Sequence, residues 1–456
     1  MRHFYYSLLF MCCFTFCKTA KISDAPKPPE QYNKVEETPL ISTLTIPISI
    51  TTDELVRSIN AKMSGALYED YAYSDNNNDG LMLNARKSQD ISLYLFGNSI
   101  KYRIPLKLWM KKKLVIGEAE AEGNIALGMK TTYKINEDWS LTTQTEVEYH
   151  EWISKPVLKT GLGDLNIEPI ANIALSRSKR TLTQTIDQYI SQQLNLKPYV
   201  QEAWTALQEP VLLSEEYKMW TKTTPIAIAM TPLTTEFNTI KAKIAVECYN
   251  DVIFGEKPMF RENAQLPNLR TILDAPDEFQ MQFATDVPYP EAERMAKTTM
   301  VGQVFESGKY KVRVEDIQLW GNNDRLVVNS KLSGSFNGNI YFMGRPKYNP
   351  LKNRIEVVDL DFHVDTRNFL YRSASWIFQG SIKKQMAAAM VFPLDENIQA
   401  LKKTVQASLV NYEIQAGMIL RGTLDSIAVQ NTALTPTGIR VDLYSKGKVN
   451  VDIKGL

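Results

Sequence analysis

A direct transition from strand to helix occurs twice in this chain and constrains its fold more than any other feature. Residues 44–63 read LTIPISITTDELVRSINAKM, and residues 279–300 read FQMQFATDVPYPEAERMAKTTM. Each stretch begins with apolar residues at alternate positions, which is the period of a half-buried strand. Each then starts a helix: Thr51 to Glu54 has the form of a capping box, and Pro290 suits a first helical turn. Pro47 within the first strand indicates a sheet edge.

The same order of elements follows in both halves. Long alternating segments come after each first helix, and 165–175 reads as the last of them in the first half. Amphipathic helices are predicted near 181–194 and 376–392, and hairpins at 225–249 and 426–452 close the halves. Short links favour antiparallel pairing. The sequence therefore predicts an α+β fold of two tandem modules, 41–255 and 275–456, related by internal duplication. Each module would be a long, curved antiparallel sheet wrapped around amphipathic helices.

Composition agrees with a folded, two-domain chain and excludes some partners. A chain of 456 residues is too long for a single compact domain. Its 44% of hydrophobic residues support a buried interior. The formal net charge is +1, and the longest basic run is the short Lys111–Lys113. A nucleic-acid partner would require a basic excess or patch, so none is predicted.

The first forty residues indicate export. An apolar run from Phe4 to Phe16 follows Arg2 and His3, which suits a signal peptide spanning 1–17. Cys17 directly follows Phe16 at the end of this segment. The stretch after it is rich in Lys, Glu and Pro and reads as a flexible linker over 18–40. Acylation of Cys17 would anchor the chain in a membrane, most simply as an outer-membrane lipoprotein of the cell envelope. Soluble secretion after cleavage near Ala20, or an uncleaved anchor, remain the alternatives.

An amphipathic helix on a curved sheet leaves an elongated apolar seam. Burying each methylene of an alkyl chain there would contribute about 0.8 kcal/mol, so the seam suits a lipid or another hydrophobic small molecule. The alternative is an ordinary core that fills the seam. The side chains expected to line such a groove are Leu55, Ile59, Met63, Leu67, Leu182, Ile186, Ile190, Met295, Met300, Met386 and Met390.

Other candidate sites are weaker. The run 75–80 resembles half of a calcium loop, but Arg86 stands where the bidentate acid belongs. Gly161 to Gly163 lacks the rest of a dinucleotide fingerprint. The alternating row Asp359, Asp361, His363 and Asp365 reads as a solvated strand face, and Cys248 as a small packed residue. We therefore predict no catalytic residue, metal or cofactor. A structural or interaction protein is the second interpretation, and an enzyme that uses carboxylates alone is the third.

Several stretches resemble a known family. They are STLTIPISI, DNNNDGLMLNARKS before DISLYLFGNSIKYRIPL, EWISKPVL before DLNIEPI, and the closing hairpin. Over nearly the whole mature chain they are similar to the uncharacterised Gram-negative envelope proteins grouped as DUF4403. The doubled helix-in-sheet plan also resembles the tubular lipid-binding superfamily, which includes the bactericidal/permeability-increasing proteins. That resemblance implies lipid held between helix and sheet. The disulfide of some secreted relatives is missing, because Cys248 has no partner cysteine in the mature chain.

Overall fold

The computed structural model describes residues 25–33 and 40–453, apart from 64, 75–77, 79, 98, 114, 116, 161–162, 194, 261–262, 380–381 and 416–417. Cys17, the predicted signal peptide 1–17 and most of the half calcium loop 75–80 lie outside the described residues. The chain divides into two compact units. The larger unit comprises Val35–Val287, Pro393–Thr432 and Arg440–Leu456, and the smaller unit comprises Met1–Lys34, Pro288–Phe392 and Ala433–Ile439.

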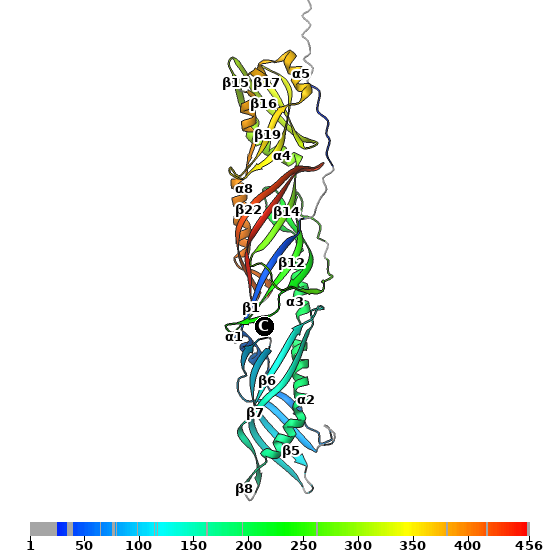
Figure 1. The fold of residues 1–456 in the computed structure, drawn as a ribbon, viewed down its shortest axis with the longest axis vertical. Helices are drawn as coiled ribbons and strands as arrows, with labels where there is room; N and C mark the ends of the chain where they lie inside the picture. The colour runs from blue at the N-terminus through cyan, green and yellow to red at the C-terminus, as the bar shows by residue number, and fades with distance from the viewer. Residues whose placement is uncertain are drawn as a thin grey trace, which may run out of the picture. The chain divides into compact units, whose positions relative to one another are not determined.

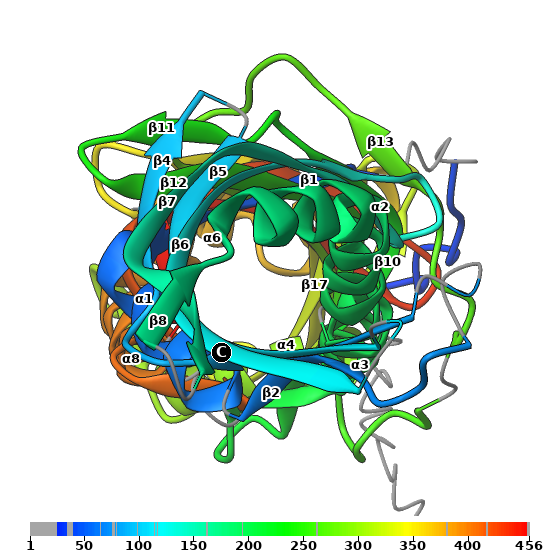
Figure 2. The same cartoon turned by 90° about the horizontal axis from the view of Figure 1, so that it is seen from below.

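A seven-stranded antiparallel sheet forms one part of the larger unit, in the order β2-β3-β5-β6-β7-β8 with β4 paired to β5. Its strands are β2 (Ala66–Asp70), β3 (Leu81–Lys87), β4 (Ser92–Phe96), β5 (Ser99–Lys113), β6 (Glu118–Ile135), β7 (Leu141–Thr160) and β8 (Gly163–Asn166). The β6–β7 ladder shifts register near Asn124 and Gly128. Such bulges bend a sheet, and the strands curve around α2 (Figure 2).

Three helices accompany this part of the chain: α1 (Thr52–Lys62), α2 (Glu168–Gln193) and α3 (Leu196–Ala206). The predicted cap of α1 is confirmed, because the Glu54 N–H donates to Thr51 Oγ1 at 3.3 Å. The predicted strand 165–175 is wrong beyond Asn166, where α2 begins two residues later. Its apolar residues, among them Ala171 and Leu175, continue with helical rather than strand spacing.

A ten-stranded sheet forms the other part of the larger unit, with the order β13-β10-β12-β1-β14-β23-β22-β21 (Figure 1). Its strands are β1 (Ser42–Thr51), β9 (Val211–Ser214), β10 (Met219–Met230), β11 (Thr234–Glu236), β12 (Thr239–Phe254), β13 (Leu269–Thr271), β14 (Phe279–Pro288), β21 (Tyr412–Gln415), β22 (Met418–Leu434) and β23 (Gly438–Ile453). The helix α8 (Asp395–Leu409) packs against it through Val405 and Leu409.

The strand β1 lies inside this sheet, so the edge position expected from Pro47 is wrong. One side of β1 pairs with β12 along its whole length. The other side pairs with β14 at Thr43 and with β23 at Ile48. Pro47 therefore stands where the neighbouring strand changes, a place where a residue without an N–H is tolerated.

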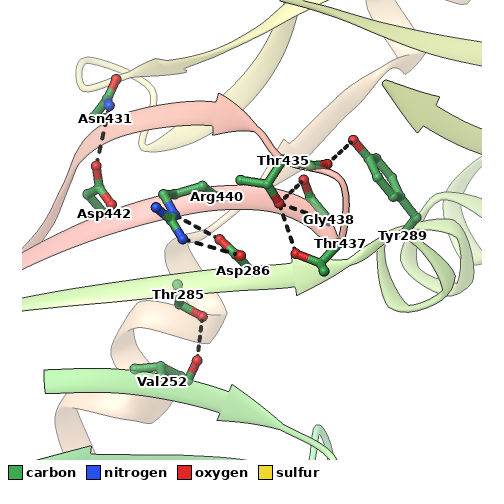
Figure 3. Close-up of polar contacts among 10 residues, drawn as sticks. All are labelled: Val252, Thr285, Asp286, Tyr289, Asn431, Thr435, Thr437, Gly438, Arg440 and Asp442. Carbon is green, nitrogen blue, oxygen red and sulfur yellow. Dashed lines mark hydrogen bonds and ion pairs between the residues drawn. The ribbon is translucent and has the colours of Figure 1, made fainter. Parts of the chain in front are cut away.

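Strands from both halves of the sequence build the ten-stranded sheet together. The carboxylate of Asp286 on β14 pairs with the Arg440 guanidinium on β23 at 2.8 Å, and Thr285 Oγ1 donates to the Val252 carbonyl on β12 at 3.2 Å (Figure 3). The order of elements predicted for 41–255 and 275–456 is present. The two stretches nevertheless share one sheet instead of each closing its own, because each closing hairpin pairs alongside an opening strand.

The smaller unit contains a six-stranded sheet in the order β15-β16-β17-β18-β19-β20. Its strands are β15 (Val304–Ser307), β16 (Tyr310–Asn322), β17 (Arg325–Gly334), β18 (Gly338–Asn349), β19 (Arg354–Phe362) and β20 (Val391–Pro393). Its helices are α4 (Tyr289–Met300), α5 (Val364–Ser373), α6 (Trp376–Gln379) and α7 (Ile382–Ala389). The single helix expected over 376–392 is thus two helices and a short strand, whereas Pro290 does lie in the first turn of α4, as predicted.

Residues 25–33, called here the N-terminal segment, pack on the end of β16 instead of behaving as part of a flexible 18–40 linker. The Gln31 N–H donates to Gly321 O at 3.2 Å, and Gln31 O accepts from the Asn323 N–H at 2.8 Å. Gly321 leaves room for the ring of Tyr32, which a Cβ would meet. Ala25 is 3% exposed. These backbone bonds and buried contacts offset the ordering cost that composition alone suggested would keep the segment loose.

Among the described helices, none combines the length and apolarity needed to cross a bilayer.

Candidate functional site

The long helix α2 buries one apolar stripe against the seven-stranded sheet. Ala171, Leu175, Leu182 and Ile186 are each less than 9% exposed and belong to one core with β3, β5 and β6. Successive members are four, seven and four residues apart, which places them on a single helix face. The predicted groove residues Leu182 and Ile186 are therefore brought together beneath α2.

The helix α1 contributes a second, less buried edge to the same core. Ile59, Met63, Leu67 and Ile190 are partly buried and pack against it. Leu55 is also half-buried, one turn earlier on α1. A polar anchor fixes α1, because the Asn60 amide donates to Ile91 O at 2.9 Å and accepts from the Ile91 N–H at 2.8 Å. The seven predicted groove residues of the larger unit thus lie on α1, β2 and α2, with Met63 as the C-cap of α1.

The seam under α2 is nearly filled. A cavity of about 20 Å³ remains, and apart from Tyr68 and Ser178 its lining is apolar, including Leu83, Met110 and Leu127. That volume holds roughly one water molecule, and apolar cavities of this kind stay dry. An alkyl chain does not fit until α2 moves away from the sheet.

Two polar clusters fasten α2 to β7. Near the start of the helix, Asn172 Oδ1 lies 2.9 Å from Trp152 Nε1, which donates to it, and 3.2 Å from His150 Nε2. Near its end, the Asp187 carboxylate accepts from Thr143 Oγ1 at 2.9 Å and from Thr145 Oγ1 at 2.7 Å. We call these the Asn172 clamp and the Asp187 clamp. In the sequence they flank the cavity-lining residues Leu175, Ser178 and Leu182.

The Asp187 clamp continues into the sheet. Thr145 Oγ1 bonds Thr131 Oγ1 at 2.7 Å, and Thr131 Oγ1 bonds the Tyr102 hydroxyl at 2.8 Å. Burial raises the pKa of Tyr102, and the hydrogen bonds of Thr131 and Thr145 oppose that shift in part. The network therefore runs through neutral hydroxyls from β5 across β6 and β7 to a single carboxylate on α2.

The remaining predicted groove residues lie in the smaller unit. Met300 is 2% exposed, Met386 0% and Met390 2%, while Met295 is half-buried. Three of these four methionines are thus almost completely buried side chains of the smaller unit. The eleven predicted residues thus form two groups in two units.

Aspartates of the acidic row on β19 and α5 form ion pairs with Arg and Lys side chains. Asp359 pairs with Arg345, and Asp361 pairs with Arg367 and with Lys383 Nζ at 2.7 Å. Burial opposes ionisation of Asp361, yet the hydrogen bonds from Lys383 and the Phe362 N–H hold its pKa below the usual value. Within the described ranges, no group of three or more His, Cys, Asp or Glu side chains is arranged to hold a metal.

Sequence reasoning missed the clamps, because Asn172, Asp187 and Thr145 are isolated polar residues without a motif. The available signal was their position: Asn172 and Asp187 adjoin the apolar stripe of α2 at Ala171 and Ile186. A polar residue beside a buried stripe needs a partner on the facing strand. A second missed feature is a polar pocket beside the N-terminal segment.

Comparison with known proteins gives a family but no described activity. A family model with the description "Domain of unknown function (DUF4403)" matches residues 41–453. No curated protein matches the sequence.

Two solved structures are distantly similar. A crystal structure of lipopolysaccharide binding protein aligns with 91% of this chain and 100% of its own, at 9% identity and a TM-score of 0.31. The structure of P47 from Clostridium botulinum A2 aligns with 89% of this chain and 96% of its own, at 7% identity and a TM-score of 0.22. TM-scores this low do not establish a common fold.

Proposed function

The chain belongs to the DUF4403 family, and we propose that this member is a non-enzymatic envelope lipoprotein that binds a lipid or another hydrophobic molecule beneath α2. The apolar seam between the Asn172 and Asp187 clamps is the observation that carries the proposal. Binding an alkyl chain in that seam requires no catalytic side chain, because burial of apolar surface alone holds the chain.

The length of α2 and the energy of burial decide what the seam could hold if α2 moves away from the sheet. The helix α2 has 26 residues and is about 39 Å long, so the seam beneath it exceeds the length of a whole extended acyl chain. Burying a chain of about twelve methylenes would contribute roughly 10 kcal/mol. Each clamp hydrogen bond contributes about 0.5–1.5 kcal/mol, or up to about 3 kcal/mol at the Asp187 carboxylate. Burial of such a chain is therefore of the same order as the clamp hydrogen bonds that an opening of α2 would break.

The proposed location rests on the sequence. The leader, Cys17 and the Pro-rich stretch after it support an acylated chain held at the outer membrane. The repeated element order supports two tubular lipid-binding modules that arose by duplication. In that arrangement Met295, Met300, Met386 and Met390 would line the second groove.

A structural or interaction protein is the second candidate. The cavity of about 20 Å³ favours it directly, because a seam that is almost filled behaves as an ordinary core. In that case the long strands present their outer faces to other envelope components, and α2 stays closed.

Native mass spectrometry with organic extraction separates the two candidates. The chain starting at Lys18 is purified without detergent from a Gram-negative host. Co-purified lipid in stoichiometric amount supports the binding function. A ligand-free mass that also fails to shift with added phospholipid or fatty acid would leave the structural candidate.

A further inference from the structure

A polar pocket of about 320 Å³ opens on the six-stranded sheet of the smaller unit. Its lining includes Lys27, Asp316, Gln318, Asn329, Lys331 and Tyr341. A volume near 300 Å³ is at the lower end for small-molecule sites. The pocket therefore has room for one small polar ligand.

Strand register explains how this pocket is built. Gln318 on β16, Asn329 on β17 and Tyr341 on β18 pair as one row across three strands. Asp316, Lys331 and Asn339 form the next row. Residues two apart on a strand share a face, so both rows point the same way. The result is a grid of polar side chains on a rigid sheet.

The N-terminal segment closes one side of the grid. Trp320 lies in the following row of the same face and packs with Ala25, Val327 and Tyr341. Lys27 places its Nζ 4.5 Å from the centre of the Trp320 ring. The segment thereby adds a cation and shields the aromatic end of the pocket.

Hydrogen bonding within the grid is incomplete. Asn329 is 8% exposed, and its Nδ2 donates to Gln318 Oε1 at 3.2 Å. Its Oδ1 has no partner among the described residues, and neither has Trp320 Nε1. Leaving such groups unpaired is unfavourable. Of these two residues, Asn329 lines the pocket, so a ligand hydroxyl there is the group suited to pair with its Oδ1.

The charge balance of the pocket is positive. Asp316 pairs with Lys297 Nζ at 2.9 Å, and the hydrogen bond from Lys297 keeps the Asp316 pKa below its usual value. The opposite charges of Asp316 and Lys297 therefore neutralise each other. Lys27 and Lys331 remain as the two cations that face a ligand.

We propose that this pocket binds a sugar unit that carries a negative charge. A hydroxyl both donates and accepts, which matches amides such as Gln318 and Asn329 that offer both functions. The Tyr341 ring, which lines the pocket, suits the apolar face of a pyranose, and Lys27 and Lys331 suit its carboxylate or phosphate.

Binding is tested by titration calorimetry on the full chain with glucuronate, glucose and inorganic phosphate as separate probes. We expect glucuronate to bind more tightly than either glucose or phosphate. Lys331→Gln should weaken glucuronate about tenfold by removing one charge-assisted bond, and Gln318→Leu should weaken both sugars. Lys347→Gln, an exposed lysine on β18 outside the pocket, is the matched control and should change nothing.

The alternative results overturn the proposal. Phosphate that binds as tightly as glucuronate would show an anion site without sugar recognition. No binding of either sugar, or equal affinity in wild type and Lys331→Gln, would mean that the grid has no such ligand. Circular dichroism spectra that match wild type ensure that the variants report on binding.

Discussion

The Asp187 carboxylate on α2 accepts hydrogen bonds from both the backbone N–H and the hydroxyl of Thr145 on β7, at 3.1 and 2.7 Å. One residue of the helix therefore satisfies two groups of the facing strand. Thr145 is 7% exposed, so these groups have little access to water when α2 is closed. The state of this contact reports directly on whether α2 lies against the sheet.

Replacing Asp187 should loosen α2 selectively. Asp187→Ala leaves the buried Thr145 hydroxyl with one partner fewer, and we expect a loss of about 2–3 kcal/mol in unfolding free energy. Urea denaturation measures that loss, and hydrogen exchange should show the amides of α2 exchanging first. Gln184→Ala, on the exposed side of the same helix, should stay within about 0.5 kcal/mol of wild type. Equal protection of α2 in wild type and Asp187→Ala would contradict the role of the clamp.

Filling the seam should separate ligand binding from folding. Ser178 lines the small cavity, and Ser178→Leu adds apolar volume there. If the seam accepts lipid, the extracted lipid should fall while the melting temperature is kept, because added methylenes contribute about 0.8 kcal/mol each when buried. Gln184→Leu is the matched control on the outer face. An unchanged lipid content in Ser178→Leu would place the ligand elsewhere, and a strongly destabilised variant would indicate a core already filled.

Cys248 should be inert in the native protein. It is 0% exposed on β12, and burial raises the pKa of its thiol to about 11, opposed only in part by Asn250. At pH 8 its thiolate fraction should be roughly two hundred times lower than that of a free thiol. In a chain starting at Lys18, which retains this cysteine alone, iodoacetamide should label it only after denaturant is added. Rapid labelling without denaturant would show that β12 opens readily.

Asp361 should contribute an acid-sensitive part of stability. Its pKa is lowered in the folded state, so its contribution is present above about pH 4, the unfolded pKa, and is lost as the pH falls through the lower folded pKa. Asp361→Asn should destabilise by less than about 1 kcal/mol at pH 7, since the side chain is 39% exposed and solvent screens the pair.

The difference between wild type and Asp361→Asn should shrink as the pH falls in urea titrations, because the wild-type carboxylate becomes protonated and loses its charge. Asp365→Asn, whose side chain is 54% exposed, provides the comparison on the same acidic row. A gap that widens on acidification would reverse the sign and refute the assignment.

Local patterns in the sequence predicted local structure well. The capping box at Thr51, the first-turn Pro290 and the alternation that becomes β16–β19 all depend on neighbours within a few residues. The pairing of β1 with β14 and β23 depends on contacts across hundreds of residues, and no local pattern encodes it. The edge position expected from Pro47 failed for this reason.

The candidate sites also combine features that local sequence patterns predict with features that depend on distant contacts. The apolar stripe that contains Leu182 and Ile186 follows from helical period, so its burial could be expected. Single polar residues such as Asn172 and Asp187 acquire a role only when a strand faces them. The grid around Asn329 needs the register of three strands, which alternation alone does not fix.

Because the N-terminal segment packs against the six-stranded sheet, the free linker after Cys17 is shorter than the sequence suggested. Only residues 18–24 separate Cys17 from Ala25, where contact with the six-stranded sheet begins. Seven residues span at most about 25 Å when fully extended. If Cys17 carries the acyl chains, the smaller unit stands within that radius of the bilayer. The short stretch before Ala25, and not a linker that extends to residue 40, would then limit how far the smaller unit lies from the membrane.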